Sequence, residues 1–215
     1  MSPTSHRLNE LLIQAGSEVI DESTADKFAS YMALLLRWNA KTNLTSIRDE
    51  EGIRSRHFVE SILCAQNIPK NITSLLDFGS GAGFPGLPIA LIRKEISVTL
   101  AESQNKKAAF LREAVRTLCL TTQVHAGRAQ DLPQTYDCVT LRAVDNMDQA
   151  IPAAVKLISP EGWLSVMTTL EESSSIQALA NQSTSDINPF FWSAPISLPK
   201  NTNRILILGQ RKSDL

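Results

Sequence analysis

The stretch Leu75–Pro88 reads LLDFGSGAGFPGLP and places four glycines and two prolines behind a short apolar run. Because glycine has no Cβ, such a loop lets the backbone come close to a bound ligand. Two nucleotide-cofactor patterns overlap in these residues. They predict similar structures but different chemistry, so the choice between them decides the predicted activity.

The chain from residue 72 onward is predicted to alternate between strands and helices. Apolar runs predict strands at residues 74–78, 96–101, 122–126, 138–141, 163–168, 190–197 and 204–208. Helical spacing predicts helices at residues 87–93, 106–118, 149–158 and 174–181, and the SPEG segment (159–162) predicts a turn before the fifth strand. This order predicts an α/β fold with a doubly wound, mainly parallel seven-stranded sheet, whose last two strands are candidates for an antiparallel edge.

The first seventy residues are predicted to be helical. Apolar residues at helical spacing predict helices at residues 26–39 and 52–67, joined by the polar segment WNAKTNLTSIRDEEG (38–52). We therefore expect an N-terminal helical extension over residues 1–70 and a nucleotide-binding α/β domain over residues 71–215.

Composition limits the class of protein. The chain has 215 residues, of which 43% are hydrophobic and 20% charged, and a net charge of −1, which is typical of a globular protein and unlike a strongly basic nucleic-acid binder. The first residues, MSPTSHRLNE, lack the pattern of a signal peptide and no apolar run has membrane-spanning length, so we expect no signal peptide and a cytoplasmic monomer without a membrane partner. Cys64, Cys119 and Cys138 are widely separated and odd in number, and we expect buried, reduced thiols and no metal site.

The first frame of the glycine loop is a dinucleotide pattern. Gly81-x-Gly83-x-x-Gly86 satisfies it, and Glu102 follows Gly83 by 19 residues, at the end of the second predicted strand. A carboxylate there accepts hydrogen bonds from a ribose diol, so this frame predicts an NAD-dependent oxidoreductase. A phosphate-binding P-loop is excluded, because no Lys-Ser or Lys-Thr pair follows the glycines.

The surroundings of the loop fit NAD poorly. In a dinucleotide fold the strand runs directly into the first glycine, whereas Gly79 and Ser80 intervene here. Pro85 and Pro88 each remove an amide donor from the turn that would bind a pyrophosphate.

A frame that starts earlier gives Asp77-x-Gly79-x-Gly81-x-Gly83. This pattern resembles the first motif of the Rossmann-like, class I S-adenosylmethionine-dependent methyltransferases. The glycines admit the methionyl and ribosyl parts of the cofactor against bare backbone, and Asp77 can hold the loop amides. Glu102 serves the ribose in this frame as well, so the loop favours S-adenosylmethionine over NAD.

Segments on both sides of the loop resemble one narrower family, the bacterial GidB (RsmG) methyltransferases that act on guanine N7 of 16S ribosomal RNA. The segments are RWNAKTNLTSIRD (37–49), RHFVES (56–61), LLDFGSGAGFPGLPIA (75–90), VTLAESQNKKAAFLRE (98–113), GRAQDL (127–132) and YDCVTLRAV (136–144). They follow the family's order over residues 37–144, a span of about half of the chain. The resemblance implies transfer of a methyl group from S-adenosylmethionine and a partner that is ribosomal RNA or the small ribosomal subunit.

The resemblance also implies a set of site residues. The implied cofactor contacts are Gly79, Gly81, Phe84, Glu102, Ala129, Gln130 and Arg142. Of these, Glu102 would bind the ribose, Ala129 and Gln130 would border the adenine, and Arg142 would face the methyl-transfer pocket. The family usually has Asp in place of Glu102, Glu in place of Gln130, and Pro-Gly-Gly in place of PEG (160–162).

Guanine N7 carries a lone pair and no proton, so its methylation needs no general base, and the chain has no convincing candidate for one. Methyltransferases that act on exocyclic amines use an Asn-Pro-Pro-Tyr-like motif after the fourth strand, where this chain has LRAVDN (141–146). The similar NPFF (188–191) follows the fifth strand and predicts a turn. Arg142 could bind the cofactor carboxylate, a phosphate or the guanine O6 edge.

The RNA-binding surface is predicted less directly. Arg54, Arg56 and His57 lie in the N-terminal segment, where we expect them to help position RNA through salt-dependent contacts. A second basic run at residues 106–116 is explained as well by a solvated helix face. Two alternative functions therefore remain: an NAD-dependent oxidoreductase, and a non-catalytic RNA-binding assembly factor that kept the fold.

Overall fold

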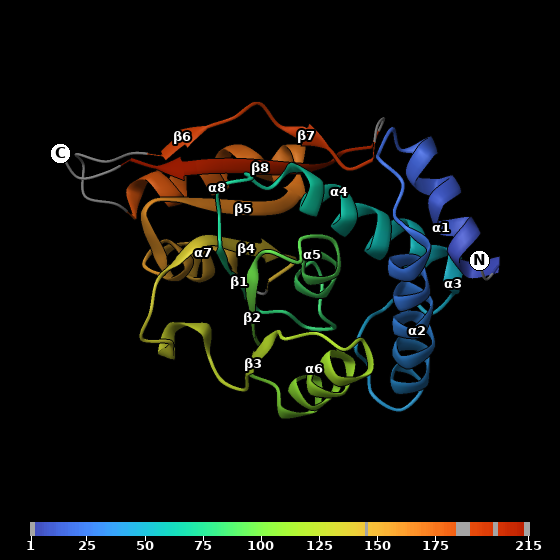
Figure 1. Ribbon diagram of the computed structural model, residues 1–215. Helices are drawn as coiled ribbons and strands as arrows, with labels where there is room; N and C mark the ends of the chain where they lie inside the picture. Colours follow the sequence, from blue (N-terminus) through green and yellow to red (C-terminus); the bar gives the residue numbers. More distant parts are fainter. Residues whose placement is uncertain (1–2, 145, 184–189, 200–201, 213–215) are drawn as a thin grey trace.

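The computed structural model describes residues 3–144, 146–183, 190–199 and 202–212, and at its centre lies a mixed eight-stranded sheet (Figure 1). The strands are β1 (Ser74–Phe78), β2 (Ser97–Ala101), β3 (Gln123–His125), β4 (Tyr136–Arg142), β5 (Ile158–Thr169), β6 (Phe190–Trp192), β7 (Ile196–Ser197) and β8 (Arg204–Arg211). Their order is β3-β2-β1-β4-β5-β8-β6, with β7 also paired to β8. The first five strands are parallel, and β8 is antiparallel to β5, β6 and β7. The strand order reverses between β1 and β4, which is where open α/β sheets bind ligands.

Helices cover both faces of the sheet (Figure 1). They are α1 (Pro3–Gln14), α2 (Glu22–Asn39), α3 (Glu50–Gly52), a π-helix η1 (Ile53–Val59), α4 (Glu60–Asn67), α5 (Gly86–Ile92), α6 (Asn105–Thr117), a 3₁₀ turn η2 (Ala129–Asp131), α7 (Met147–Val155) and α8 (Leu170–Gln182). Side chains alternate along each strand. Leu75 of β1 therefore packs in the core with α1, α2, α4, α5 and α6, whereas Leu76 packs in the core with α7 and α8.

The N-terminal helices share a core with the sheet. Leu8 of α1, Phe28 of α2 and Phe58 of η1 belong to the same buried cluster as Leu75 of β1 and Phe110 of α6. The first residues are helical, as the sequence predicts, but the apolar faces of these helices pack against the α/β unit itself. No helix in the described residues is long and apolar enough to cross a membrane.

The predicted helix at residues 52–67 is interrupted. Its first half is the π-helix Ile53–Val59, and a regular helix resumes at Glu60. A wider π turn changes which backbone groups find partners inside the helix. The carbonyl of Arg56, in this π segment, accepts a hydrogen bond of 2.5 Å from Arg142 Nη2 on β4, a contact that helical periodicity does not predict.

Two predicted features near the C-terminus differ in detail. The strand expected at residues 190–197 is divided into β6 and β7, because Pro195 lies between them and has no N–H to donate. The SPEG segment lies inside β5 as an irregularity, where the β4–β5 register shifts and Glu161 has a φ of 60°. Of NPFF, Asn188 and Pro189 lie outside the described residues.

One cysteine departs from expectation. Cys64 and Cys138 are buried, but Cys119 is exposed. It follows the end of α6 with a φ of 52°, so the chain leaves the helix there through the left-handed region, and the side chain is exposed to solvent.

Candidate active site

A cavity of about 550 Å³ opens beyond the carboxyl ends of β1, β2 and β4. All seven residues expected to contact the cofactor lie in its lining, namely Gly79, Gly81, Phe84, Glu102, Ala129, Gln130 and Arg142. His57 lies in the lining too, whereas Arg54 and Arg56 do not. A cavity of this size matches the usual range for small-molecule and cofactor sites.

The glycine loop forms the floor of this cavity. The amides of Gly79 and Ser80 both donate to the carbonyl of Ala101 at the end of β2, each at 3.0 Å. Gly81 has a φ of 56°, and a Cβ built there would meet no atom closer than 3.9 Å. Because Gly81 lines the cavity, such a Cβ would occupy space that a ligand can use.

Glu102 connects the loop to the start of α6. One carboxylate oxygen accepts the Gly81 amide at 2.9 Å, and the other accepts the Gln104 amide at 2.7 Å. Each carboxylate oxygen can accept more than one hydrogen bond. Glu102 therefore holds the loop in place and keeps acceptor capacity for two ribose hydroxyls, as S-adenosylmethionine requires.

Asp77 lies beneath the loop and is buried. Its carboxylate accepts the amide of Gly86 at 3.0 Å. Burial is the main cause that raises the pKa of Asp77 to about 7; the hydrogen bonds from Ser80 and Gly86 oppose this shift. The expected role of Asp77, holding a loop amide, is present in the structure.

The start of α5 is unsuited to a pyrophosphate. The Gly86 amide donates to Asp77, the Leu87 amide donates to the Gly83 carbonyl at 2.8 Å, and Pro88 has no amide hydrogen. The first turn therefore has no free N–H for a phosphate, which NAD would need. The residues of the cavity fit S-adenosylmethionine better than NAD.

The rings of Phe84 in the glycine loop and His57 in η1 form one wall of the cavity. Phe84 stacks on His57, with ring centroids 4.5 Å apart and an interplanar angle of 16°. On α2, Tyr31 stacks on Phe84 at 5.3 Å, and its hydroxyl donates to the carbonyl of Ala82. Tyr31 is fully buried in the core, as the apolar stripe of α2 predicts, and it supports the cavity wall from behind through Phe84.

His57 is a neutral part of this wall. Its Nε2 is 2.8 Å from Thr45 Oγ1, and its Nδ1 is buried without a partner among the described residues. Burial, followed by the positive charges of Arg142, Arg56 and Arg204, lowers the pKa of His57 to about 3. The imidazole is therefore uncharged at neutral pH and lines the cavity. It does not supply the positive charge that a contact with an RNA phosphate would use.

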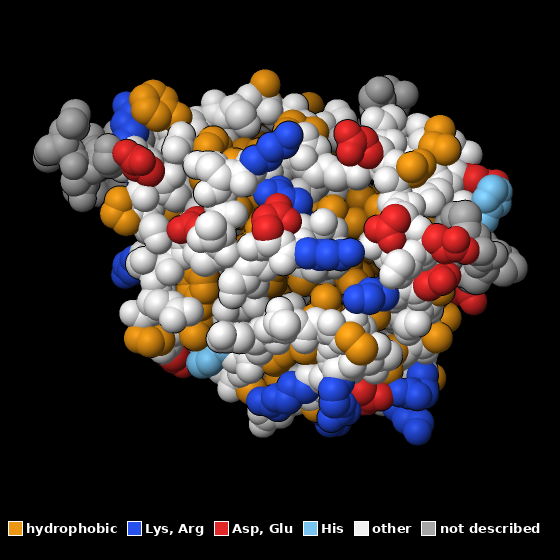
Figure 2. All heavy atoms as spheres, viewed as in Figure 1, with side chains coloured by type: hydrophobic (Ala, Val, Ile, Leu, Met, Phe, Trp, Pro, Cys, Tyr) orange, Lys and Arg blue, Asp and Glu red, His pale blue; other side chains and the backbone are white. Residues whose placement is uncertain are grey.

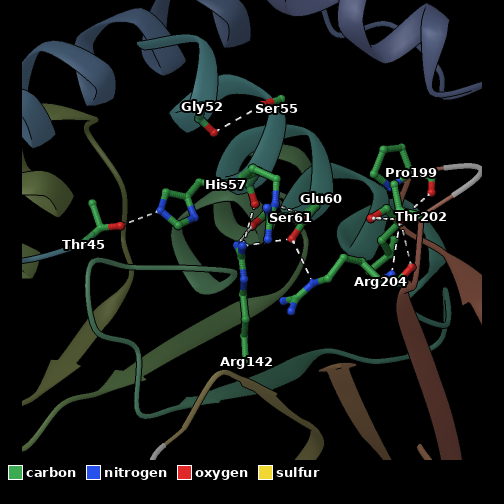
Figure 3. Close-up of polar contacts among 12 residues, drawn as sticks. Thr45, Gly52, Ser55, His57, Glu60, Ser61, Arg142, Pro199, Thr202 and Arg204 are labelled. Atoms are coloured by element: carbon green, nitrogen blue, oxygen red, sulfur yellow. Dashed lines mark hydrogen bonds and ion pairs between the residues drawn. The ribbon is translucent and has the colours of Figure 1, made fainter. Parts of the chain in front are cut away.

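Arg142 is held by a buried carboxylate (Figure 3). Its Nη2 lies 2.9 Å from Glu60 Oε2, and its Nη1 lies 3.4 Å from Ser61 Oγ. The Glu60 side chain is 1% exposed, and that of Arg142 is 8% exposed. Burial lowers the pKa of Arg142 while Glu60 opposes this shift, and a guanidinium stays protonated in proteins.

The three residues expected to bind RNA have different environments in the structure. Arg54 is buried, forms ion pairs with Glu50 and Glu51, and does not line the cavity. Arg56 is 54% exposed and donates from Nε to Glu60 Oε1 at 3.0 Å. Glu60 was not among the predicted site residues. The i,i+4 spacing of Arg56 and Glu60 in RHFVES (56–61) is the local pattern that could have pointed to it.

The basic run of residues 106–116 lies on α6. In Figure 2, Lys and Arg side chains gather along the lower edge of the visible face, over α6. Lys107 of this run also lies in the lining of the cavity. The basic run therefore reaches the cavity through Lys107.

This fold is that of the Rossmann-like class I methyltransferases, which confirms the expected fold class. A ribosomal protein L11 methylase from Lactobacillus delbrueckii subsp. bulgaricus has a TM-score of 0.59 at 11% identity, covering 76% of this chain and 80% of that one. M. jannaschii TYW2 in complex with AdoMet also has a TM-score of 0.59, at 12% identity, covering 79% and 80%. At these identities the likeness shows the fold alone.

The narrower assignment comes from sequence. The family model GidB, rRNA small subunit methyltransferase G, matches residues 24–190. A Ribosomal RNA small subunit methyltransferase G of Xanthomonas oryzae pv. oryzae is 38% identical over 166 residues, 76% of this chain and 77% of the relative. One of Roseiflexus sp. is 46% identical over 132 residues, 58% of this chain, and the match spans only 56% of that relative's length. The chain belongs to the GidB family, and the resemblance is confirmed.

Proposed function

We propose that this protein transfers the methyl group of S-adenosylmethionine to N7 of a guanine in 16S ribosomal RNA. Family membership and the names of the relatives support a small-subunit ribosomal RNA as the substrate. Such a substrate supports a cytoplasmic location. The observation that carries the proposal is a cavity that Glu102 lines beside the glycine loop, with no strong proton acceptor at the expected transfer site among its described residues.

The cofactor supplies an electrophilic methyl group on a sulfonium centre. Glu102 is proposed to accept the ribose hydroxyls with its remaining lone pairs, while Gly79 and Gly81 let the cofactor lie against the backbone. Ala129 and Gln130 are proposed to border the adenine. Gln130 is neutral where the family usually has a carboxylate, so this contact depends on amide hydrogen bonds.

The groups around the expected transfer site suit guanine N7. His57 has a pKa of about 3, so it is a weak base. Arg142 is cationic, donates hydrogen bonds and cannot accept a proton. Because N7 has a free lone pair, positioning and electrostatics can supply the acceleration without proton removal.

The direct test is transfer of a labelled methyl group. Labelled S-adenosylmethionine is incubated with 16S ribosomal RNA and with small subunits that lack the modification, and the product base is mapped. The expected product is N7-methylguanine. Label on another base would refute the choice of guanine N7, and binding of either substrate without transfer would favour an assembly factor.

A calorimetric titration separates the remaining alternative. S-adenosylmethionine and NAD are titrated separately into the protein. Binding of the first alone is expected, because the first turn of α5 has no free amide for a pyrophosphate. Tighter binding of NAD would overturn the methyltransferase proposal.

A further inference from the structure

Three arginines from distant parts of the chain share one buried carboxylate. Glu60 pairs with Arg56 of η1 at 3.0 Å, with Arg142 of β4 at 2.9 Å and with Arg204 of β8 at 4.0 Å. Figure 3 shows Arg142 and Arg204 reaching Glu60 from different strands. One carboxylate therefore organises three guanidinium groups beside the cavity.

The cluster carries excess positive charge. Three guanidinium groups against one carboxylate leave two uncompensated positive charges among these residues. Glu172 is a further acid whose negative charge interacts with Arg204, so one positive charge remains in excess when this carboxylate is counted as well. Such excess charge beside a cavity is a basis for binding an anion.

The three arginines differ in the hydrogen-bond donors that they keep free. Arg142 uses both terminal nitrogens, on Glu60, Ser61 and the Arg56 carbonyl. Arg56 contacts Glu60 through Nε, and among the described residues neither its terminal nitrogens nor those of Arg204 have a partner. The side chains of Arg56 and Arg204 are 54% and 24% exposed, against 8% for Arg142. The free guanidinium forks are thus the accessible ones.

The forks lie next to the site of chemistry but outside the cavity lining. Arg142 and His57 line the cavity, and Arg56 and Arg204 do not. Both outer arginines pair with Glu60, the same carboxylate that holds the cavity-lining Arg142, so their forks lie close to this wall. An anion bound by the two outer forks would lie beside a base that enters the cavity.

We propose that Arg56 and Arg204 form a binding site for a backbone phosphate of the RNA strand beside the target nucleotide. Guanidinium forks match phosphate oxygens in geometry and charge. Glu60 is the positioning residue that orients both forks through Nε. The site rests on the proposed function, because its ligand is the RNA substrate.

The cofactor carboxylate is the other oxyanion that such forks can bind. It would lie inside the cavity with the rest of the cofactor, where Arg142 is the arginine in the lining. A backbone phosphate and the cofactor carboxylate predict different results in binding titrations. Loss of a phosphate site weakens RNA binding alone, whereas loss of a carboxylate site weakens cofactor binding.

The test uses Arg56→Gln, Arg204→Gln and the double variant in the full chain. Binding of unmodified 16S ribosomal RNA is measured across a salt series. Each single variant is expected to bind about tenfold more weakly and to lower the log–log salt slope by roughly 0.7 to 0.9, the value for one lost phosphate contact. Binding of S-adenosylhomocysteine is expected to stay unchanged, which also shows that the variants fold.

Lys94→Gln is the matched control. Lys94 is exposed and precedes β2, at the opposite edge of the sheet from the cavity, so this variant removes one positive charge without touching the cluster. It is expected to bind RNA as the unmodified protein does. Arg56→Lys, which keeps the charge but loses the fork, is expected to retain most of the salt slope at reduced affinity.

The inference is overturned if the salt slope and RNA affinity of the double variant equal those of Lys94→Gln. It is also overturned if the variants lose S-adenosylhomocysteine binding, because the anion would then be the cofactor carboxylate. If the unmodified protein binds RNA but transfers no methyl group, and the variants still show the loss, the proposed function fails while the phosphate site stands.

Discussion

Asp77 and Glu102 are two buried carboxylates beneath the same glycine loop, and their contacts assign them different roles. Asp77 is enclosed, and burial raises its pKa to about 7. Glu102 lines the cavity and binds the Gly81 amide with one oxygen. Asp77 therefore supports the loop from below, and Glu102 is the one that can reach a ligand.

Replacing Glu102 with alanine is expected to weaken S-adenosylhomocysteine binding by about tenfold to a hundredfold. The change removes the charged acceptor for the ribose and the acceptor for the Gly81 amide, and a hydrogen bond to a charged group contributes about 1.5–3 kcal/mol. Glu102→Asp keeps the carboxylate and is expected to lose less. Isothermal titration calorimetry measures both.

Glu95→Ala is the control, because Glu95 is exposed and lies just before β2, away from the cavity. It is expected to leave the affinity unchanged. An unchanged affinity in Glu102→Ala would remove Glu102 from the cofactor site.

At the scale of single elements, the glycine loop combines two kinds of glycine. Gly81 has open space where its Cβ would be, whereas a Cβ on Gly86 would lie 2.3 Å from Leu100 Cδ2 and 2.5 Å from Asp77 Oδ2. The first glycine leaves room in the cavity, and the second lets α5 pack closely on β1 and β2.

The two glycines are expected to respond differently to alanine. Gly86→Ala should destabilise the fold by about 1–3 kcal/mol or more, as overpacking does in a tight core. Gly81→Ala should cost about 1–2 kcal/mol for the left-handed backbone and should additionally weaken cofactor binding. Urea denaturation and a cofactor titration on both variants measure the two effects. Equal stability losses with unchanged affinity in Gly81→Ala would contradict this distinction.

The π-helix Ile53–Val59 is the element that apolar periodicity predicted least well. Its apolar residues Ile53, Phe58 and Val59 are buried as a helical stripe requires. The departure from α-helical geometry coincides with a tertiary contact, the hydrogen bond from Arg142 to the carbonyl of Arg56. That partner lies 86 positions away in the sequence, so no local pattern encodes it.

At the scale of the whole molecule, the N-terminal helices and one face of the sheet share a core. Leu12 and Phe28 belong to the same buried cluster as Leu75 and Leu100. Tyr31 of α2 also reaches the carbonyl of Ala82 in the glycine loop. A separate N-terminal unit would have to expose this apolar surface to water.

Unfolding is therefore expected to be one cooperative transition. Trp38 lies on α2 and packs against Phe110, while Trp163 and Trp192 lie in the sheet. In a variant that keeps Trp38 alone, the urea midpoint by fluorescence should coincide with the midpoint by far-ultraviolet circular dichroism. An earlier fluorescence midpoint would mean that the N-terminal helices unfold independently.

The pH dependence of stability is expected to contain two opposing contributions. Asp77 keeps a proton in the folded state up to about pH 7, whereas the unfolded chain releases it near 3.8, so this group lowers stability as the pH rises through that window. His57 stays neutral down to about pH 3, whereas the unfolded chain binds a proton near 6.5, so this group raises stability over the same range. Each contribution is roughly 4 kcal/mol, and the two largely cancel.

Single substitutions should reveal each contribution. In Asp77→Asn the free energy of unfolding is expected to rise with pH between about 4 and 7, and in His57→Gln it is expected to fall. Carboxyl groups whose pKa is lowered, such as that of Asp137, act mainly below this window. Urea denaturation at several pH values measures the slopes. Parallel profiles for the two variants would refute the assignment.

The sequence by itself determined the order of strands and helices and the position of the glycine loop, and it predicts S-adenosylmethionine in place of NAD. These follow from local features: the spacing of apolar residues, the backbone freedom of glycine and the missing amides of Pro85 and Pro88. Such features act over a few residues, so they can be predicted without knowing what packs against them.

Only the tertiary structure decided the electrostatics of the site. It buried Arg54, kept His57 neutral and joined Arg142 to Glu60 across 82 positions of sequence. The physical reason is that desolvation and Coulomb interactions depend on distances in space between segments that the sequence keeps far apart. The free guanidinium groups of Arg56 and Arg204 became visible only when three elements met around one carboxylate.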